Sequence, residues 1–327
     1  MISTRLTEML GIEHPVMLAG MGGVSYNRLV AAVSEAGGFG CLGAGTMGPD
    51  QMVAEMAAVR EKTDRPFGVD LLTALPADMV AQVRQVIEGG ASVFVAGLGV
   101  PRDVIELCHD AGVLVVNMCG KVAHAVKAVE AGCDVVVAQG TEAGGHTGLV
   151  ATMPLVPQIV DAVGARVPVV AAGGIFDGRG LAAALALGAD GVWVGTRFIA
   201  TPEANGAPGY RDKLLATGED GTTITRAYSG KPMRTVRNDY TAYFDANPDE
   251  LQPFPMQIAR SFGDGVFHLG GDEHSEGVDP ARECYPCGQG VGAIGELVPA
   301  AELVVRFVAE AEDALARAAS MRAGIRT

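Results

Sequence analysis

Eight short segments rich in Val, Ile and Phe recur along roughly the first 200 residues of the chain. Each is almost continuously apolar rather than alternating, which is typical of strands buried on both faces of a sheet. Amphipathic, alanine-rich stretches lie between them, and consecutive segments are about 25 residues apart, which suits a strand–helix repeat. The eight segments begin near Pro15, Gly38, Phe67, Ser92, Val113, Asp134, Val167 and Gly191.

Eight strand–helix units predict a fold of the α/β class, a closed (β/α)8 or TIM barrel. A doubly wound open sheet is the competing architecture, although such sheets more often have about five to seven strands. In a barrel the active site forms from the loops that follow the strands, so these loops are where candidate chemistry is sought.

The strand–helix rhythm stops after the eighth segment. Residues 201–290 carry Pro, Gly, Asp and Asn in loop-like clusters, and a final helix is predicted over Glu296–Met321. So long a connection after strand eight predicts an irregular or helical insertion that covers the substrate at the carboxyl ends of the strands. We therefore expect a barrel formed by residues 1–200 and 291–327 with an insertion at 201–290, not two independent cores.

The composition narrows the range of functions. Hydrophobic residues make up 49% of the 327 residues and charged residues 19%, which excludes intrinsic disorder. The net charge of −14 disfavours binding to nucleic acids and to anionic membrane surfaces. No segment approaches the ~20 apolar residues of a membrane span, and the first ten residues lack the apolar core of a signal peptide. With cysteines mostly in apolar contexts, we expect a reduced, cytoplasmic protein.

Two glycine-rich loops follow the seventh and eighth predicted strands, at the position where TIM barrels usually bind phosphate. They contain Gly173–Gly174 and Gly195–Thr196. Backbone N–H groups at such loops can bind an anion, so a phosphorylated ligand is the first hypothesis. The alternative is that the glycines only allow the chain to turn.

A third glycine-rich loop follows strand six and contains His146 between Gly145 and Thr147. An imidazole at the catalytic end of a barrel can act as an acid or a base near neutral pH, although a lone histidine is often structural. Glu142 in the same loop could orient His146 or could be a solvated carboxylate, and the sequence does not decide between the two.

The first loop, Ala19–Gly22, would let the backbone approach a flat ligand closely. Asp70 ends strand three and Gln139 ends strand six, where each could contact polar atoms of a ligand. Together with the phosphate loops, these features fit flavin mononucleotide (FMN), although spacing alone does not assign the phosphate to FMN.

Cys284 and Cys287 form a lone CxxC motif in the insertion. A tetrahedral site needs four ligands, and the spacing of His268 and His274 to this pair matches no standard zinc pattern. We therefore expect no metal site.

The motifs on these loops resemble those of the nitronate monooxygenase (2-nitropropane dioxygenase) family, which includes FMN-dependent enoyl-acyl-carrier-protein reductases and NAD(P)H:quinone reductases. The resemblance covers roughly residues 10–200. Its segments are HPVMLAGMGGVS, AAVSEAGGFGCLGAG, TDRPFGVDLL, AQGTEAGGHTG, VPVVAAGGIFDGRG and ALGADGVWVGTRF.

The resemblance implies that His146 is the active-site histidine and that FMN is the cofactor. It places the FMN phosphate on the loops after strands seven and eight and the rest of the flavin against the other loops. The implied cofactor-binding residues are Ala19, Gly20, Met21, Gly22, Asp70, Gln139, Gly144, Gly145, Gly173, Gly174, Gly195 and Thr196. The family usually has Asn at the position of Asp70, and a carboxylate there would disfavour an anionic reduced flavin unless it is protonated or turned away.

Three functions follow from the resemblance. The first is an FMN-dependent nitronate monooxygenase that uses O2 to oxidise alkyl nitronates. The second is an NAD(P)H-dependent FMN reductase of quinones or enoyl thioesters, because parts of 201–290 are similar to the reductase branch. The third is a flavin-binding protein without turnover. The expected partners are a small-molecule substrate and O2 or an organic electron acceptor, and homodimer formation is left open.

Overall fold

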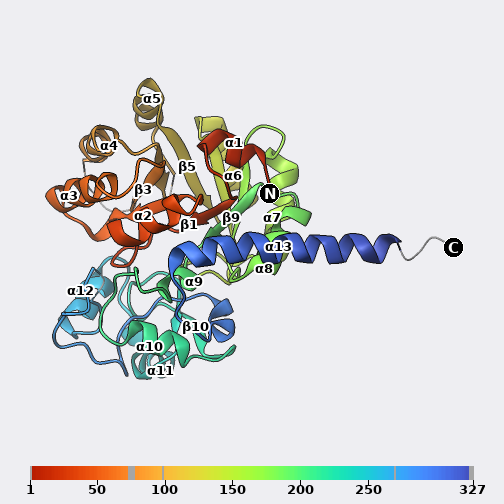
Figure 1. The fold of residues 1–327 in the computed structure, drawn as a ribbon. Helices are drawn as coiled ribbons and strands as arrows, with labels where there is room; N and C mark the ends of the chain where they lie inside the picture. The colour runs from red at the N-terminus through yellow and green to blue at the C-terminus, as the bar shows by residue number, and fades with distance from the viewer. Residues whose placement is uncertain (1, 73–77, 98, 269, 324–327) are drawn as a thin grey trace.

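The computed structural model describes residues 2–72, 78–97, 99–268 and 270–323 (Figure 1). All eight predicted strands are present and parallel, in the order β1-β9-β8-β6-β5-β4-β3-β2. A parallel bridge between Met17 and Phe39 joins β1 to β2 and closes the barrel. The strands are β1 (Val16–Leu18), β2 (Gly40–Gly43), β3 (Phe67–Leu71), β4 (Val93–Ala96), β5 (Leu114–Cys119), β6 (Val135–Gln139), β8 (Val169–Ala172) and β9 (Gly191–Val194).

The helices that follow the strands cover the outside of the barrel (Figure 1). They are α2 (Asn27–Glu35), α3 (Pro49–Arg60), α4 (Met79–Glu88), α5 (Arg102–Asp110), α6 (Val122–Ala131), α7 (Thr152–Val163) and α8 (Gly178–Ala186). The final helix, α13 (Ala300–Ala323), starts four residues later than the sequence predicts and packs against both α8 and α2. It therefore completes the outer ring where the chain returns from the insertion.

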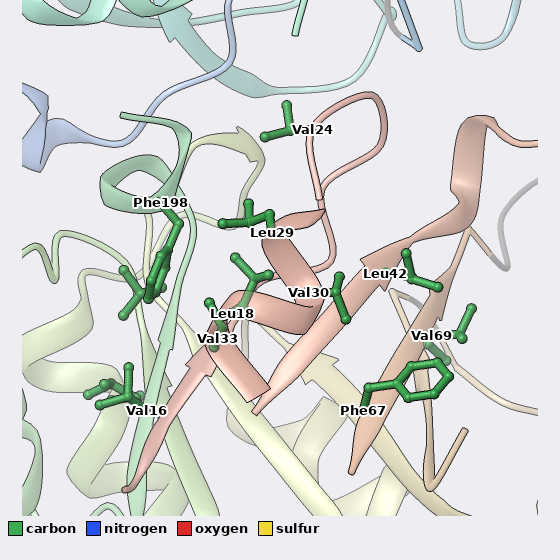
Figure 2. Close-up of a cluster of buried hydrophobic side chains, with 14 of the residues drawn as sticks. Val16, Leu18, Val24, Leu29, Val30, Val33, Leu42, Phe67, Val69 and Phe198 are labelled. Atoms are coloured by element: carbon green, nitrogen blue, oxygen red, sulfur yellow. The ribbon is translucent and has the colours of Figure 1, made fainter. Parts of the chain in front are cut away.

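Alternate residues of each strand enter two different cores. Met17, Phe39 and Trp193 fill the barrel interior, together with Leu6 and Leu10 of α1 (Arg5–Leu10). Val16, Leu18, Leu42, Val69 and Phe198 belong to the outer cluster between the strands and the helices (Figure 2). Burial on both faces explains why the strands are apolar throughout rather than alternating.

The insertion packs against the loops at the carboxyl ends of the strands and has a small apolar core of its own, built around Tyr228, Tyr240 and Phe244. Its helical elements lie together at one end of the barrel (Figure 1). They are α10 (Tyr210–Leu215), α11 (Asp239–Ala246), α12 (Met256–Gly263) and the short 3₁₀ turns η2 (Pro248–Glu250) and η3 (Gln289–Ala293), the last of which reaches back into the barrel segment. Two further elements belong to the barrel: the short helix α9 (Thr196–Ile199) follows β9, and the turn η1 (Ala44–Thr46) follows β2.

The insertion also contains a β-hairpin that the sequence did not predict. Its strands β10 (Thr222–Thr225) and β11 (Met233–Val236) are antiparallel, and β11 pairs in turn with a two-residue strand, β7 (Gly145–His146), from the barrel. Short strands of this kind carry little periodic signal, because their pairing with distant chain decides whether they form.

Within the described residues, no helix is both long and apolar enough to cross a lipid bilayer.

Candidate active site

Asp70 and Gln139 occupy interior positions at the carboxyl ends of β3 and β6. Cys41 of β2 points into the barrel interior and is paired with Gly68 of β3. Asp70 is two residues further along β3, so its side chain also points into the interior. Gln139 follows interior Val137 with the same spacing. The alternation of the strands therefore brings both polar side chains to the mouth of the barrel, as the sequence predicts.

The first loop closes tightly over Asp70. A Cβ atom at Gly20 would lie 2.2 Å from Cβ of Asp70, and one at Gly22 would lie 2.9 Å from Cγ2 of Thr46. Only glycine fits such distances without a shift of the chain, so the backbone of Ala19–Gly22 forms one wall of the mouth. Thr46 contributes to this wall and was not predicted from the sequence.

The two candidate phosphate loops hold backbone donors that the protein itself does not use. Gly173 and Gly174 have φ of +106° and +71°, in the left-handed region that favours glycine. In the described part of the chain, no hydrogen bond uses the N–H of Gly173, Gly174, Gly195 or Thr196. Four free amides at two adjacent strand ends fit the phosphate of a ligand.

The insertion reaches these loops and covers them. The N–H of Gly288 donates to Oγ1 of Thr196 at 2.8 Å, and a Cβ at Gly290 would lie 3.3 Å from the carbonyl oxygen of Gly174. Gly144 lies against Cys287, since a Cβ at Gly144 would be 2.8 Å from Cα of Cys287. The end of the insertion therefore packs directly on the loops after β6, β8 and β9.

His146 is held in place by contacts from both the barrel and the insertion. Its backbone pairs with Met233 of β11, and its carbonyl oxygen accepts Nε2–H of Gln139 at 2.9 Å. Its ring nitrogen Nε2 lies 2.9 Å from Oγ of Ser229. Part of the glycine-rich loop predicted after strand six is thus a short strand, and the side chain of His146 has a partner 83 residues away.

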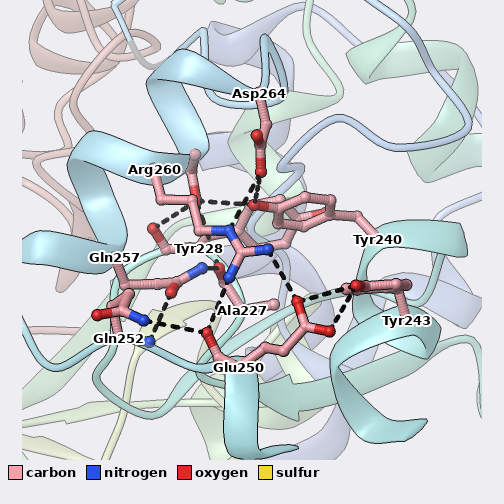
Figure 3. Close-up of polar contacts among 10 residues, drawn as sticks. Ala227, Tyr228, Tyr240, Tyr243, Glu250, Gln252, Gln257, Arg260 and Asp264 are labelled. Carbon is pink, nitrogen blue, oxygen red and sulfur yellow. Dashed lines mark hydrogen bonds and ion pairs between the residues drawn. The ribbon is translucent and has the colours of Figure 1, made fainter. Parts of the chain in front are cut away.

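Helix α12 fixes the segment that supplies Ser229 (Figure 3). The buried side chain of Gln257 donates to the carbonyl oxygen of Ala227, and Ser261 donates to that of Tyr228 at 3.0 Å. The Ser229 hydroxyl also lies 3.2 Å from the carbonyl oxygen of Lys231, to which it can donate. Used in this way, the Ser229 oxygen accepts from Nε2–H of His146, which leaves Nδ1 with a free lone pair.

The environment of His146 favours its neutral form. The surrounding protein lowers the pKa of His146 below its ordinary value by desolvating the charged form, and the positive charge of Lys231 lowers it further. The side chain still has solvent-accessible surface at the mouth of the barrel. A neutral, accessible imidazole can accept a proton from a substrate at neutral pH.

Comparisons with known proteins identify the family of the chain. The sequence model named nitronate monooxygenase matches residues 3–310. The chain belongs to the nitronate monooxygenase family. The family predicted from the sequence motifs is thereby confirmed, and with it an oxidoreductase activity and a flavin as the cofactor.

Three proteins similar to this family member carry different names. The (3aS,4S,5R,7aS)-5-hydroxy-7a-methyl-1-oxo-octahydro-1H-indene-4-carboxyl-CoA dehydrogenase of Mycobacterium tuberculosis is 44% identical over 73% of this chain and 67% of its own. The structure of FabK from Thermotoga maritima is 35% identical, with a TM-score of 0.89 over 98% of this chain and 100% of that one. The structure of nitroalkane oxidase from Streptomyces ansochromogenes is 31% identical, with a TM-score of 0.81 over 95% and 99%.

Glu142 has neither of the roles that the sequence left open. Its carboxylate accepts the backbone N–H of Thr152 at 2.9 Å and Oγ1–H of the same residue at 2.9 Å, at the first residue of α7. An acidic side chain there satisfies a free N–H and interacts favourably with the helix dipole. Glu142 thus caps a helix, while Ser229, which has no sequence motif to mark it, contacts His146 instead.

Cys284 and Cys287 are both buried free thiols, but they belong to different hydrophobic clusters. Burial raises the pKa of Cys287 to about 12 and raises that of Cys284 as well, so both are protonated at neutral pH. In the described ranges, no three His, Cys, Asp or Glu side chains are grouped so that they could hold a metal ion.

The effect of Lys231 on His146 can be measured directly. Lys231→Met removes a positive charge that lowers the pKa of His146, so this pKa should rise toward the ordinary value of about 6.5. The histidine resonances followed by NMR against pH give the shift. Lys127→Met, which changes an exposed lysine on α6, is the control and should leave the titration unchanged. An unchanged or lowered pKa in Lys231→Met would show that Lys231 does not act on this ring.

Proposed function

We propose that this protein is an FMN-dependent enzyme that oxidises alkyl nitronates with O2, and that His146 handles the substrate proton. The observation that carries the proposal is an imidazole whose Nε2 lies 2.9 Å from Oγ of Ser229 and whose pKa burial lowers, at the same barrel mouth as four unused backbone amides. Family membership supports a flavin, and these amides support a flavin that carries a phosphate.

The residues of the mouth fit FMN in number and kind. The free amides of Gly173, Gly174, Gly195 and Thr196 would hold the phosphate. The close-packed wall at Ala19–Gly22, the side chains of Asp70 and Gln139 and the glycines at 144 and 145 would hold the remainder of the cofactor. When bound, FMN supplies the electron acceptor for the oxidation.

His146 would act on the substrate before oxidation. A neutral nitroalkane must lose its α-proton to become a nitronate: the C–H bond breaks, its electron pair stays on the substrate, and the proton goes to the imidazole. Because Ser229 lies on Nε2, the nitrogen that accepts this proton is Nδ1. A nitronate that is already anionic needs no base and would use the imidazole only for positioning.

Replacement of Gly195 by aspartate tests the phosphate site. Gly195 has φ of −105°, a value that other residues can adopt, and a Cβ there would approach only Sδ of Met21 at 3.3 Å and Cβ of Ala19 at 3.5 Å. Gly195→Asp should abolish FMN binding because its carboxylate repels the phosphate, while Gly195→Ala should retain it. Fluorescence titration with FMN measures both. Wild-type affinity in Gly195→Asp would place the phosphate elsewhere.

Replacement of His146 separates its chemistry from its role in the fold. His146→Ala should keep FMN and change the free energy of unfolding by no more than ~1 kcal/mol, because the side chain is exposed and makes one hydrogen bond. Its kcat/KM should fall by at least ~100-fold, and further on a neutral nitroalkane than on the nitronate. His124→Ala, at an exposed histidine of α6, is the control. Unchanged kinetics in His146→Ala would give this residue a structural role only.

A second candidate function is an NAD(P)H-dependent reductase or a dehydrogenase that acts on acyl thioesters. It is favoured by the 44% identity to a relative whose name specifies a carboxyl-CoA substrate. Anaerobic mixing of the FMN-loaded protein with NADH or NADPH distinguishes the two functions. Under the nitronate proposal, neither nucleotide bleaches the flavin rapidly, whereas nitronates do. Rapid bleaching by a nicotinamide would favour the reductase, and a flavin that neither reagent reduces would indicate a binding protein.

A further inference from the structure

Asp70 is a carboxyl group at the top of the barrel interior. It lies in β3 between Gly43 of β2 and Val95 of β4, above the buried thiol of Cys41. The backbone of Gly20 covers it from the side of the first loop. Protein therefore surrounds Asp70 on the side of the barrel wall, and its remaining accessible surface opens to the mouth.

The carboxyl group of Asp70 stands out by its lack of polar contacts in the part of the chain that the structure describes. Within the described residues, no donor hydrogen-bonds to it and no cationic side chain forms an ion pair with it. Aspartates at the other end of the barrel differ: Asp190 accepts the N–H of Val169 and forms an ion pair with Arg5, and Asp134 also accepts a backbone N–H. Asp70 thus differs from these two aspartates, since none of the described residues around it donates a hydrogen bond or a positive charge to its carboxyl group.

Desolvation decides the protonation state of such a group. An ionised carboxylate that loses most of its water and accepts no hydrogen bond in exchange is disfavoured, so burial raises the pKa of Asp70 well above its ordinary value. Among the described residues, the titratable group that faces Asp70 is Cys41 of β2, since Gly20 of the first loop and Val95 of β4 carry no charge. Burial, and secondarily Asp70 itself, raises the pKa of that thiol too, so Cys41 is neutral and offers no compensating positive charge.

We propose that Asp70 is a neutral carboxylic acid at physiological pH and that its O–H is a hydrogen-bond donor reserved for the cofactor bound in the barrel mouth. The inference rests on the proposed FMN site. It adds that the carboxyl proton of Asp70 takes part in FMN binding, so that loss of this proton weakens the binding. Asp70 would help to position the flavin through its O–H group. This donor is lost once the carboxyl group of Asp70 ionises.

The sign of the pH dependence follows from this arrangement. Below the pKa of Asp70 the donor is present, so Asp70 adds no pH dependence to the FMN affinity. Above that pKa the free protein must regain a proton to bind FMN, so Kd rises with pH, by up to about tenfold per pH unit for a single proton. An amide at this position would donate an N–H without titrating, which makes Asp70→Asn the matched variant.

The experiment combines infrared spectroscopy with FMN titration on the full-length chain. In the ligand-free protein at neutral pH, the wild-type minus Asp70→Asn difference spectrum should contain the C=O stretch of a protonated carboxyl group, and this band should disappear as the pH is raised. Fluorescence titration over about pH 5 to 10 should show that the ratio of the wild-type Kd to the Asp70→Asn Kd rises with pH, because the ionisations of FMN itself affect both proteins alike. Asp70→Ala should bind about 2- to 13-fold more weakly than Asp70→Asn at neutral pH, the range expected for one hydrogen bond.

Each result separates this inference from the flavin proposal. If FMN binds but the carboxyl band is absent at neutral pH, or if wild type and Asp70→Asn share one pH profile, the inference about Asp70 is overturned while the flavin site stands. If the band is present but no FMN binds at any pH, the flavin site is wrong, and so is the donor role of Asp70 toward it, although Asp70 is protonated. Cys41→Ala should retain the band, which excludes the neighbouring thiol as its source.

Discussion

The pairing of β7 with β11 is the interaction on which the candidate site depends. Two residues of the barrel, Gly145 and His146, form a strand only because the insertion supplies a partner for their backbone groups. The same contact brings Ser229 and Lys231 to the imidazole, one to orient it and the other to lower its pKa. The insertion therefore contributes both to the position of the candidate catalytic group and to its protonation state, alongside the contact from Gln139 and the desolvation that is the larger cause of the lowered pKa.

Two titratable side chains at the mouth of the barrel are shifted toward their neutral forms. The protein carries a net charge of −14, yet His146 is shifted toward its neutral form by a lowered pKa and Asp70 toward its neutral form by a raised one. Desolvation is the larger cause in both cases, because it penalises whichever form is charged. The donors that remain at the phosphate loops are backbone amides, which carry partial charges and do not titrate. Such a site suits a cofactor that brings its own negative charge.

The division between barrel and insertion also bears on specificity. The structures of FabK and of nitroalkane oxidase both overlay on more than nine-tenths of this chain, although their names describe different proteins. The barrel loops carry the shared motifs, whereas the sequence similarity noted for 201–290 is looser. We therefore propose that the choice of substrate is made by the side chains that the insertion adds beside His146, Ser229 and Lys231 among them.

The sequence by itself determined the barrel, its strand–helix order, the loops that bear the motifs and the family. These features are local: an apolar run buried on both faces, a helical repeat and a glycine at a strand end are each encoded within a few neighbouring residues. That the side chains of Asp70 and Gln139 face the barrel interior also follows from their own strands, because alternate residues of a strand point to the same side. For these reasons the final helix and all eight strands could be placed from the sequence.

Only the tertiary structure decided the partners of the functional groups. Glu142 caps α7 through Thr152, ten residues away, whereas the contact between His146 and Ser229 spans 83 residues and needs the hairpin and α12 to be folded. The desolvation of Asp70 depends on the backbone of Gly20, which covers its side chain, and on neighbouring strands whose described residues offer it no hydrogen-bond donor or positive charge. Hydrogen-bond partners and desolvation depend on which atoms converge in space. A linear pattern records that a residue can accept or donate a proton, but the environment that sets its pKa exists only after the chain has folded.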